Sequence, residues 1–245
     1  MLFPKGKLES YALTEEKTNI TLYVIYIKNL SRIKDDDTIR LHLVASLTQA
    51  GEFKEAELEA YRLLNTKYRD KAYVLFYNIE KAKFFSKKDG NIEKMQAYLL
   101  EAINSTKDRE LLILVHREAI SMNLPFVAMK SSEKLYKVTG EIEWLKRTYR
   151  YANALTDMEK SLSYAFELYK KDLSKKDRKA LFMEIVQMYI WKGEYDSMKE
   201  FIRLHYMEFV NDEEVLKFVL RSALATGDSA FVREIAEGIK SEVLK

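Results

Sequence analysis

The chain has 245 residues, of which 47% are hydrophobic and 32% are charged, so it has enough apolar content to bury a substantial core and is not disordered over most of its length. Only 7 Gly and 2 Pro occur, which are too few turn residues for a β-sandwich or an alternating strand and helix fold. The absence of Cys excludes disulfides and cysteine nucleophiles, and the net charge of +3 from 41 basic and 38 acidic residues does not demand an anionic partner.

The first predicted element is a lone helix over residues 16–33, after an extended segment over residues 1–15. The apolar stripe of this helix is formed largely by Leu22, Ile25, Tyr26, Asn29 and Leu30. Residues 20–27 taken alone also fit a strand, and the helical neighbours favour the helix. The start has no apolar segment with a cleavage site, and no later run approaches the roughly 18 apolar residues of a membrane span.

A turn motif then recurs along the chain. Residues 47–56 are repeated in outline at 189–198 and 224–232, with a weaker copy at 88–95. Each copy ends one amphipathic helix, reverses at a residue suited to positive φ, and opens the next helix with an acidic or amide residue. With two further turns that lack Gly, the turn positions are 51, 90, 123, 156, 193 and 227, spaced by 39, 33, 33, 37 and 34 residues.

Polar N-cap signals mark the other boundary of each repeat. They precede apolar-periodic runs at 35–37, 107–108, 176–177 and 211–213. The predicted helix pairs are 37–50 with 52–66, 70–88 with 91–105, 108–122 with 125–138, 141–155 with 157–172, 177–192 with 194–209, and 212–226 with 228–243.

The pairs resemble the tetratricopeptide repeat, a helix pair of roughly 34 residues. The turn glycine, the aromatic two residues later and the small residue three beyond it are matched by Gly51, Phe53 and Ala56, and by Gly193 and Tyr195 with Met198 in the small position. The resemblance covers residues 36–243. It weakens at the second repeat, which carries extra residues around 86–89, and the terminal Pro of the family is missing, so HEAT-like or related α-solenoid pairing stays open.

The resemblance implies an all-α fold: a right-handed superhelix of about six antiparallel, tetratricopeptide-like helix pairs plus one N-terminal helix, forming a single α-solenoid domain over residues 1–245. It also implies a protein–protein interaction scaffold that holds a peptide segment or a helix of a partner in its concave groove. Known members assemble multi-protein complexes, including bacterial secretion and polysaccharide export. The lone helix resembles the second half of a preceding repeat, as in a piece of a longer protein. The compartment stays open between the cytoplasm, for the chain as given, and the periplasm.

Residues that carry chemistry are few. His42, His116 and His205 have no second His or carboxylate four residues away to complete a metal site on a helix, and we interpret them as packed between helices. No Gly-rich phosphate loop or nucleophile elbow occurs, and adjacent carboxylates stand at helix starts, where capping explains them. The sequence therefore predicts a protein that is not an enzyme, with no metal site and no cofactor.

If the family geometry holds, fixed positions of the first helices point into the groove. The predicted partner-binding residues are Arg117, Lys146, Arg150, Asn153, Gln187, Trp191, Lys217 and Arg221. A ladder of guanidinium groups with an amide and an indole would hold carboxylates of an extended partner segment. The alternative interpretation is that these side chains form ordinary solvated helix faces.

Two other kinds of partner remain as alternatives. The arginine ladder would also suit an anionic polymer, such as nucleic acid or an acidic polysaccharide, whose binding falls steeply with salt. Self-association through exposed Tyr and Phe at the open ends is the second alternative. Most of the aromatic residues are interpreted as core, and the basic run over 170–179 as a solvated loop.

Overall fold

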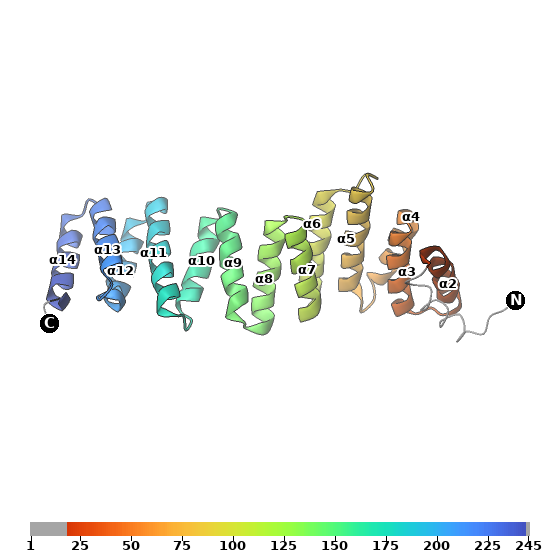
Figure 1. Cartoon of the computed structure of the whole chain (residues 1–245), viewed down its shortest axis with the longest axis horizontal. Helices are drawn as coiled ribbons and strands as arrows, with labels where there is room; N and C mark the ends of the chain where they lie inside the picture. Colours follow the sequence, from red (N-terminus) through yellow and green to blue (C-terminus); the bar gives the residue numbers. More distant parts are fainter. Residues whose placement is uncertain (1–18, 244–245) are drawn as a thin grey trace. The chain divides into compact units, whose positions relative to one another are not determined.

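The computed structural model describes residues 19–243, so the predicted segment 1–15 and the start of the lone helix lie outside the described residues. Within this range the chain forms thirteen α-helices and one 3-10 helix, without a strand (Figure 1). Two compact units are present, and the division between them falls between Trp144 and Leu145, inside one helix. The expectation of one continuous domain over the whole chain stays a prediction.

From residue 19 on, the first unit holds seven helices and the start of an eighth. They are α2 (Ile20–Ile33), α3 (Asp37–Gln49), α4 (Phe53–Leu63), α5 (Arg69–Phe85), α6 (Ile92–Ser105), α7 (Arg109–Ser121), α8 (Pro125–Thr139) and the first residues of α9 (Ile142–Ala154). The second unit holds the rest of α9, then α10 (Met158–Tyr169), α11 (Lys175–Lys192), α12 (Tyr195–His205), η1 (Tyr206–Phe209), α13 (Glu213–Ala225) and α14 (Ser229–Val243). All six predicted helix pairs are confirmed, with small differences at their ends.

Five of the six elbows reverse as predicted. The residues with positive φ are Gly51, Asn123, Thr156, Gly193 and Gly227. The second elbow differs, because Lys87 and Asp89 take the left-handed conformation and Gly90 does not. A Cβ on Gly90 would lie 2.1 Å from the backbone nitrogen of Phe84. The prediction of Gly90 as the positive-φ residue was wrong: glycine is required there because the elbow backbone lies against α5.

Side-chain caps begin most first helices where the sequence predicts them. Asp36, Asp108 and Asp212 each accept a hydrogen bond from a backbone N–H of the following turn. At α11 the predicted signal at Lys176 and Asp177 was wrong by a few residues. Ser174 is the N-cap, and its hydroxyl accepts a hydrogen bond from the Asp177 N–H. Since α10 already ends at Tyr169, α11 can begin at Lys175, before the predicted start.

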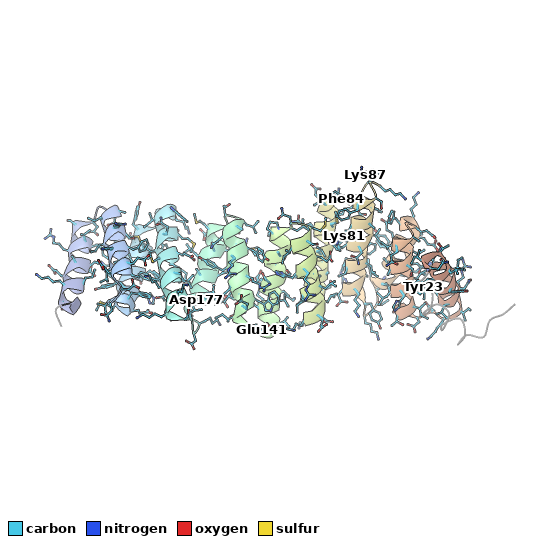
Figure 2. The ribbon with its side chains drawn as sticks, in the orientation of Figure 1. Tyr23, Lys81, Phe84, Lys87, Glu141 and Asp177 are labelled. Carbon is cyan, nitrogen blue, oxygen red and sulfur yellow. The ribbon has the colours of Figure 1, made fainter. Side chains whose placement is uncertain are left out.

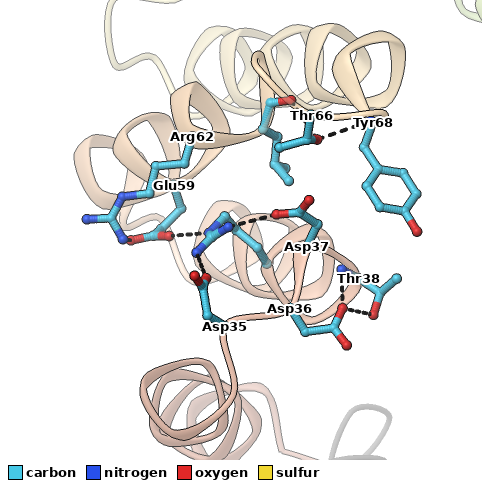
Figure 3. A network of polar contacts seen from close by, with 10 residues as sticks. Asp35, Asp36, Asp37, Thr38, Glu59, Arg62, Thr66 and Tyr68 are labelled. Carbon is cyan, nitrogen blue, oxygen red and sulfur yellow. Dashed lines mark hydrogen bonds and ion pairs between the residues drawn. The ribbon is translucent and has the colours of Figure 1, made fainter.

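A polar network joins the loop before α3, α3 itself and α4 in the first unit (Figure 3). The guanidinium of Arg40 on α3 lies 2.5 Å from Asp35, 2.8 Å from Asp37 and 3.2 Å from Glu59 of α4. Beneath it, Leu43 and Leu47 pack with the fully buried Ala56 and Ala60. The small side chains allow α3 and α4 to approach closely, which explains why the family pattern favours a small residue at position 56.

In the second unit the first helices and the second helices of the pairs form separate rows. Lys146 of α9 reaches Asp177 of α11, and Lys179 of α11 reaches Asp212 at the start of α13. Among the second helices, Phe166 of α10 contacts Phe201 of α12. Lys199 of α12 reaches Asp228, which immediately precedes α14. We call the surface of α9, α11 and α13 the first-helix face, and it carries the candidate site.

Helix α2, which corresponds to the predicted N-terminal helix, packs on α3 and buries Tyr23, Val24, Ile27 and Leu30. Its remaining surface is partly apolar, since Leu22, Ile25 and Ile33 are exposed. The predicted packing stripe through Leu22, Ile25 and Asn29 was therefore wrong, because the face that packs on α3 lies one residue further along the helix. Residues 20–27 are helical, which excludes the strand that this run alone would also fit. None of the described helices is long and apolar enough to span a membrane.

Candidate functional site

Two adjoining clefts open on the first-helix face of the second unit. The first, of about 240 Å³, is lined by Lys146, Tyr149, Arg150, Asn153, Leu168, Leu173, Asp177, Ala180, Leu181 and Glu184. The second, of about 360 Å³, is lined by Tyr149, Asn153, Thr156, Met158, Ser161, Glu184, Gln187, Met188 and Trp191. The clefts share Tyr149, Asn153 and Glu184, so they form one continuous depression between α9 and α11, which we call the α9–α11 groove.

A hydrogen bond between α9 and α11 joins two residues that line both clefts of the groove. Tyr149 of α9 is buried, and its hydroxyl donates to the carboxylate of Glu184 on α11. Burial and the nearby Glu184 carboxylate raise the pKa of the Tyr149 phenol above its ordinary value. The phenol therefore stays neutral and holds Glu184 in place as a fixed acceptor.

The charges of the first cleft balance. The Lys146 ammonium lies 3.1 Å from Asp177, which stands in the first turn of α11 (Figure 2), and this contact lowers the pKa of the Asp177 carboxyl. Arg150 is exposed and forms no ion pair with any residue in the range 19–243. With Glu184 included, two cations face two carboxylates, so the first cleft has no net charge.

The second cleft has an apolar wall. Met158 of α10 and Met188 of α11 supply thioether side chains, and Met188 is only 4% exposed. Trp191, one helical turn beyond Met188, stands at the rim with 66% of its surface exposed. Two amides, Asn153 and Gln187, provide donors and acceptors along the same cleft.

The structure brings five of the eight predicted site residues together. Lys146, Arg150, Asn153, Gln187 and Trp191 line the groove. Lys217 and Arg221 lie outside both clefts on α13, and the Lys217 ammonium is 2.6 Å from Glu213. Arg117 is exposed on α7, in the first unit, so it is not part of this groove.

Several groove residues were missed by sequence reasoning. Tyr149, Met158 and Met188 stand at positions whose helical periodicity predicts core, and Tyr149 and Met188 are indeed largely buried. Periodicity does not distinguish a core side chain from one that is buried yet lines a cleft. Glu184 carried a weak signal, because it lies one turn before Gln187 on the same helix face.

Further clefts occur in the first unit, with a different character. One of about 640 Å³ is lined mainly by charged residues of α2, α3 and α4, including the Arg40 network, whose cations already face carboxylates. Another, of about 360 Å³, lies between α6 and α8, where Lys130 and Lys137 both pair with Glu133. The first has no amide in its lining, and the second has Leu100, Ile103 and the amide of Asn104 but no aromatic ring.

The interpretation of the histidines as packed between helices holds for His116 and was wrong for His42, which is exposed. His116 is buried, with Nδ1 2.9 Å from the Ser131 hydroxyl, and His205 Nδ1 lies 2.7 Å from Glu208. Among residues 19–243, no group of three His, Asp or Glu side chains is arranged to hold a metal ion.

No protein-family model matches the sequence, and no curated protein matches it. Among solved structures, the chain is similar to the structure of Naa15/Naa10 bound to HypK-THB, with a TM-score of 0.55 and 8% identity over 97% of this chain and 37% of that one. It is also similar to a tetratricopeptide repeat protein from Parabacteroides merdae, with a TM-score of 0.41 and 13% identity over 97% of this chain and 92% of that one. A third similar structure is the TPR2AB domain of yeast Sti1 in complex with pHSP90, with a TM-score of 0.34 and 12% identity over 95% of this chain and 96% of that one.

The fold is tetratricopeptide-like. This assignment agrees with the successive helix pairs, the positive-φ elbows and the buried Ala56 in the small position of the repeat. The tetratricopeptide-like repeats of this chain are degenerate, since Met198 fills the small position of the fifth pair and the second elbow carries its left-handed residues before Gly90.

Proposed function

We propose that the chain is a non-catalytic scaffold that binds an extended segment of a partner protein in the α9–α11 groove. The observation that carries this proposal is the pair of adjoining clefts, which combine an apolar wall, two amides and an exposed indole on neighbouring helices. Concave sites with a few placed polar groups are typical of ligand-binding pockets. Tetratricopeptide repeat proteins commonly assemble multi-protein complexes. We propose that this chain likewise acts within a larger assembly, such as one for bacterial secretion or export.

The groove offers the two kinds of contact that a peptide needs. Asn153 and Gln187 can both donate to and accept from the main chain of an extended segment. The apolar wall offers burial for a side chain of that segment. Because α9 and α11 are tied by Tyr149 with Glu184 and by Lys146 with Asp177, the groove is preformed, which lowers the entropy cost of binding.

The charge distribution argues against an anionic polymer as the partner. Of the five basic residues in the predicted ladder, Lys146 and Lys217 already pair with carboxylates. A polyanion is held by rows of uncompensated cations, and each phosphate contact makes binding more dependent on salt. We therefore expect the affinity for the partner to change little with ionic strength.

The test uses a photocrosslinking amino acid placed at single positions of the full chain in cells. Position 153, in the groove, is compared with position 204, because Leu204 is 68% exposed on the second-helix row. A discrete protein crosslinked from position 153 and not from position 204 supports the proposal. Equal crosslinking from both positions, or crosslinking from position 204 alone, contradicts it.

A further inference from the structure

The second cleft of the α9–α11 groove has the chemistry of a pocket for one apolar side chain. Met158 and Met188 form its wall, and their unbranched thioether chains adapt to ligands of different shape. Its volume of about 360 Å³ is at the lower end of the range of ligand pockets, so it suits a side chain and a short stretch of backbone.

The exposed indole of Trp191 lines the same cleft. Trp191 is 66% exposed, whereas Trp side chains are highly buried on average. Tryptophan is enriched among the residues that dominate binding energy at interfaces. An apolar side chain that enters the cleft would lie between the largely buried Met188 thioether and the Trp191 ring and would cover the exposed ring.

The balanced charges of the first cleft limit what an acidic ligand gains. A carboxylate that approaches Arg150 also approaches Glu184, which lines the same cleft and is held there by Tyr149. Lys146 offers little compensation, because Asp177 already faces its ammonium at 3.1 Å. Attraction and repulsion therefore offset each other for a charged residue, while an uncharged apolar residue meets no such opposition.

We infer that the bound segment is an uncharged, extended peptide that inserts one large apolar side chain, Leu, Met or Phe, between Met188 and Trp191. This inference rests on the proposed function of the groove. It replaces the guanidinium ladder expected from the sequence with an apolar pocket as the element that selects the partner.

A dodecapeptide library displayed on phage and panned on the immobilised full chain tests this inference. Enriched peptides are synthesised and titrated by fluorescence polarisation against wild type, Trp191→Ala, Arg150→Glu and the matched control Leu204→Ala. We expect one aligned position to hold Leu, Met or Phe without enrichment of Asp or Glu. Trp191→Ala should weaken binding by about tenfold or more, and Arg150→Glu and Leu204→Ala by less than about twofold. All three substituted residues are exposed, so the variants should keep the wild-type circular dichroism spectrum.

The outcomes separate the inference from the proposed function. Enrichment of acidic peptides whose binding is lost in Arg150→Glu would overturn the apolar-pocket inference and leave the groove as the binding site. Peptides that bind Trp191→Ala and Arg150→Glu as tightly as wild type, or the absence of any enriched peptide, would overturn both.

Discussion

The Lys146 ammonium of α9 lies 3.1 Å from the Asp177 carboxylate in the first turn of α11. The same relationship recurs one repeat later, where Lys179 lies 2.8 Å from Asp212 at the start of α13. In the first unit, Arg109 at the start of α7 lies 3.2 Å from Glu141, which immediately precedes α9 (Figure 2). A basic residue near the start of one first helix thus reaches an acidic residue at the start of the next, where the helix dipole also favours negative charge.

This relationship predicts that Lys146 contributes little to partner binding. In Lys146→Met the aliphatic stem is kept and the charge is removed, so the expected change in affinity for a groove peptide is less than about threefold, in line with the small energies of surface ion pairs. Isothermal titration calorimetry of wild type and variant gives the comparison. A loss as large as that of Trp191→Ala would show that Lys146 anchors the ligand.

The elbow between α5 and α6 predicts a strong effect of one methyl group. Gly90→Ala places a Cβ 2.1 Å from the Phe84 backbone nitrogen, which is held in the α5 helix, so the elbow must move. We expect the free energy of unfolding to fall by about 1–3 kcal/mol, as for overpacked sites. Urea denaturation followed by circular dichroism measures this change.

Gly238→Ala is the matched control for that experiment. Its Cβ would meet the Tyr206 hydroxyl at 2.2 Å, which is the end of a side chain, and Ala is the better helix former inside α14. We expect Gly238→Ala to cost less than Gly90→Ala. The reverse order would contradict the backbone contact at Gly90.

Acid sensitivity is expected to depend on Glu118 of α7. Burial opposes ionisation of this carboxyl, but hydrogen bonds from Lys81 and Tyr77 of α5 outweigh burial and lower its pKa below the ordinary value of 4.5. A depressed pKa in the folded state means that the ionised carboxylate adds stability above about pH 4.5, and that this contribution is lost as the pH falls through the lower folded pKa.

In Glu118→Gln the loss of unfolding free energy between neutral pH and pH 3 should therefore be smaller than in wild type. Urea denaturation at both pH values measures the difference. Identical pH dependence in the two proteins would show that the Glu118 carboxyl has no lowered pKa in the folded state.

Local chemistry made most of the fold predictable. Elbows at Gly51, Asn123 and Gly193 require positive φ, and caps such as Asp108 satisfy backbone N–H groups, so both leave a signal within a few residues. Gly90 was misjudged, because its close approach to Phe84 is a tertiary contact that turn chemistry does not encode. Ser174 was passed over for Asp177, since both are good cap residues and the choice depends on where α10 ends.

The candidate site was harder to predict for a related reason. Family positions identified the polar residues on the first helices, such as Arg150 and Gln187, from sequence spacing alone. Whether a cation is free depends on a residue some 31 positions away, as Lys146 and Asp177 show. Met188 follows the core periodicity although it lines a cleft, so the apolar half of the groove is visible only once α9, α10 and α11 are packed together.

The most direct test of the account is the fluorescence of Trp191 during binding. In Trp144→Phe, Trp191 is the sole tryptophan of the chain, and its exposed indole reports on the second cleft. Titration with a peptide selected on the full chain should shift the emission to shorter wavelengths and saturate at the same concentration as the polarisation signal, because the apolar side chain covers the ring. A peptide that binds with unchanged affinity while the Trp191 emission stays at its starting wavelength would show that the peptide does not occupy the second cleft of the α9–α11 groove.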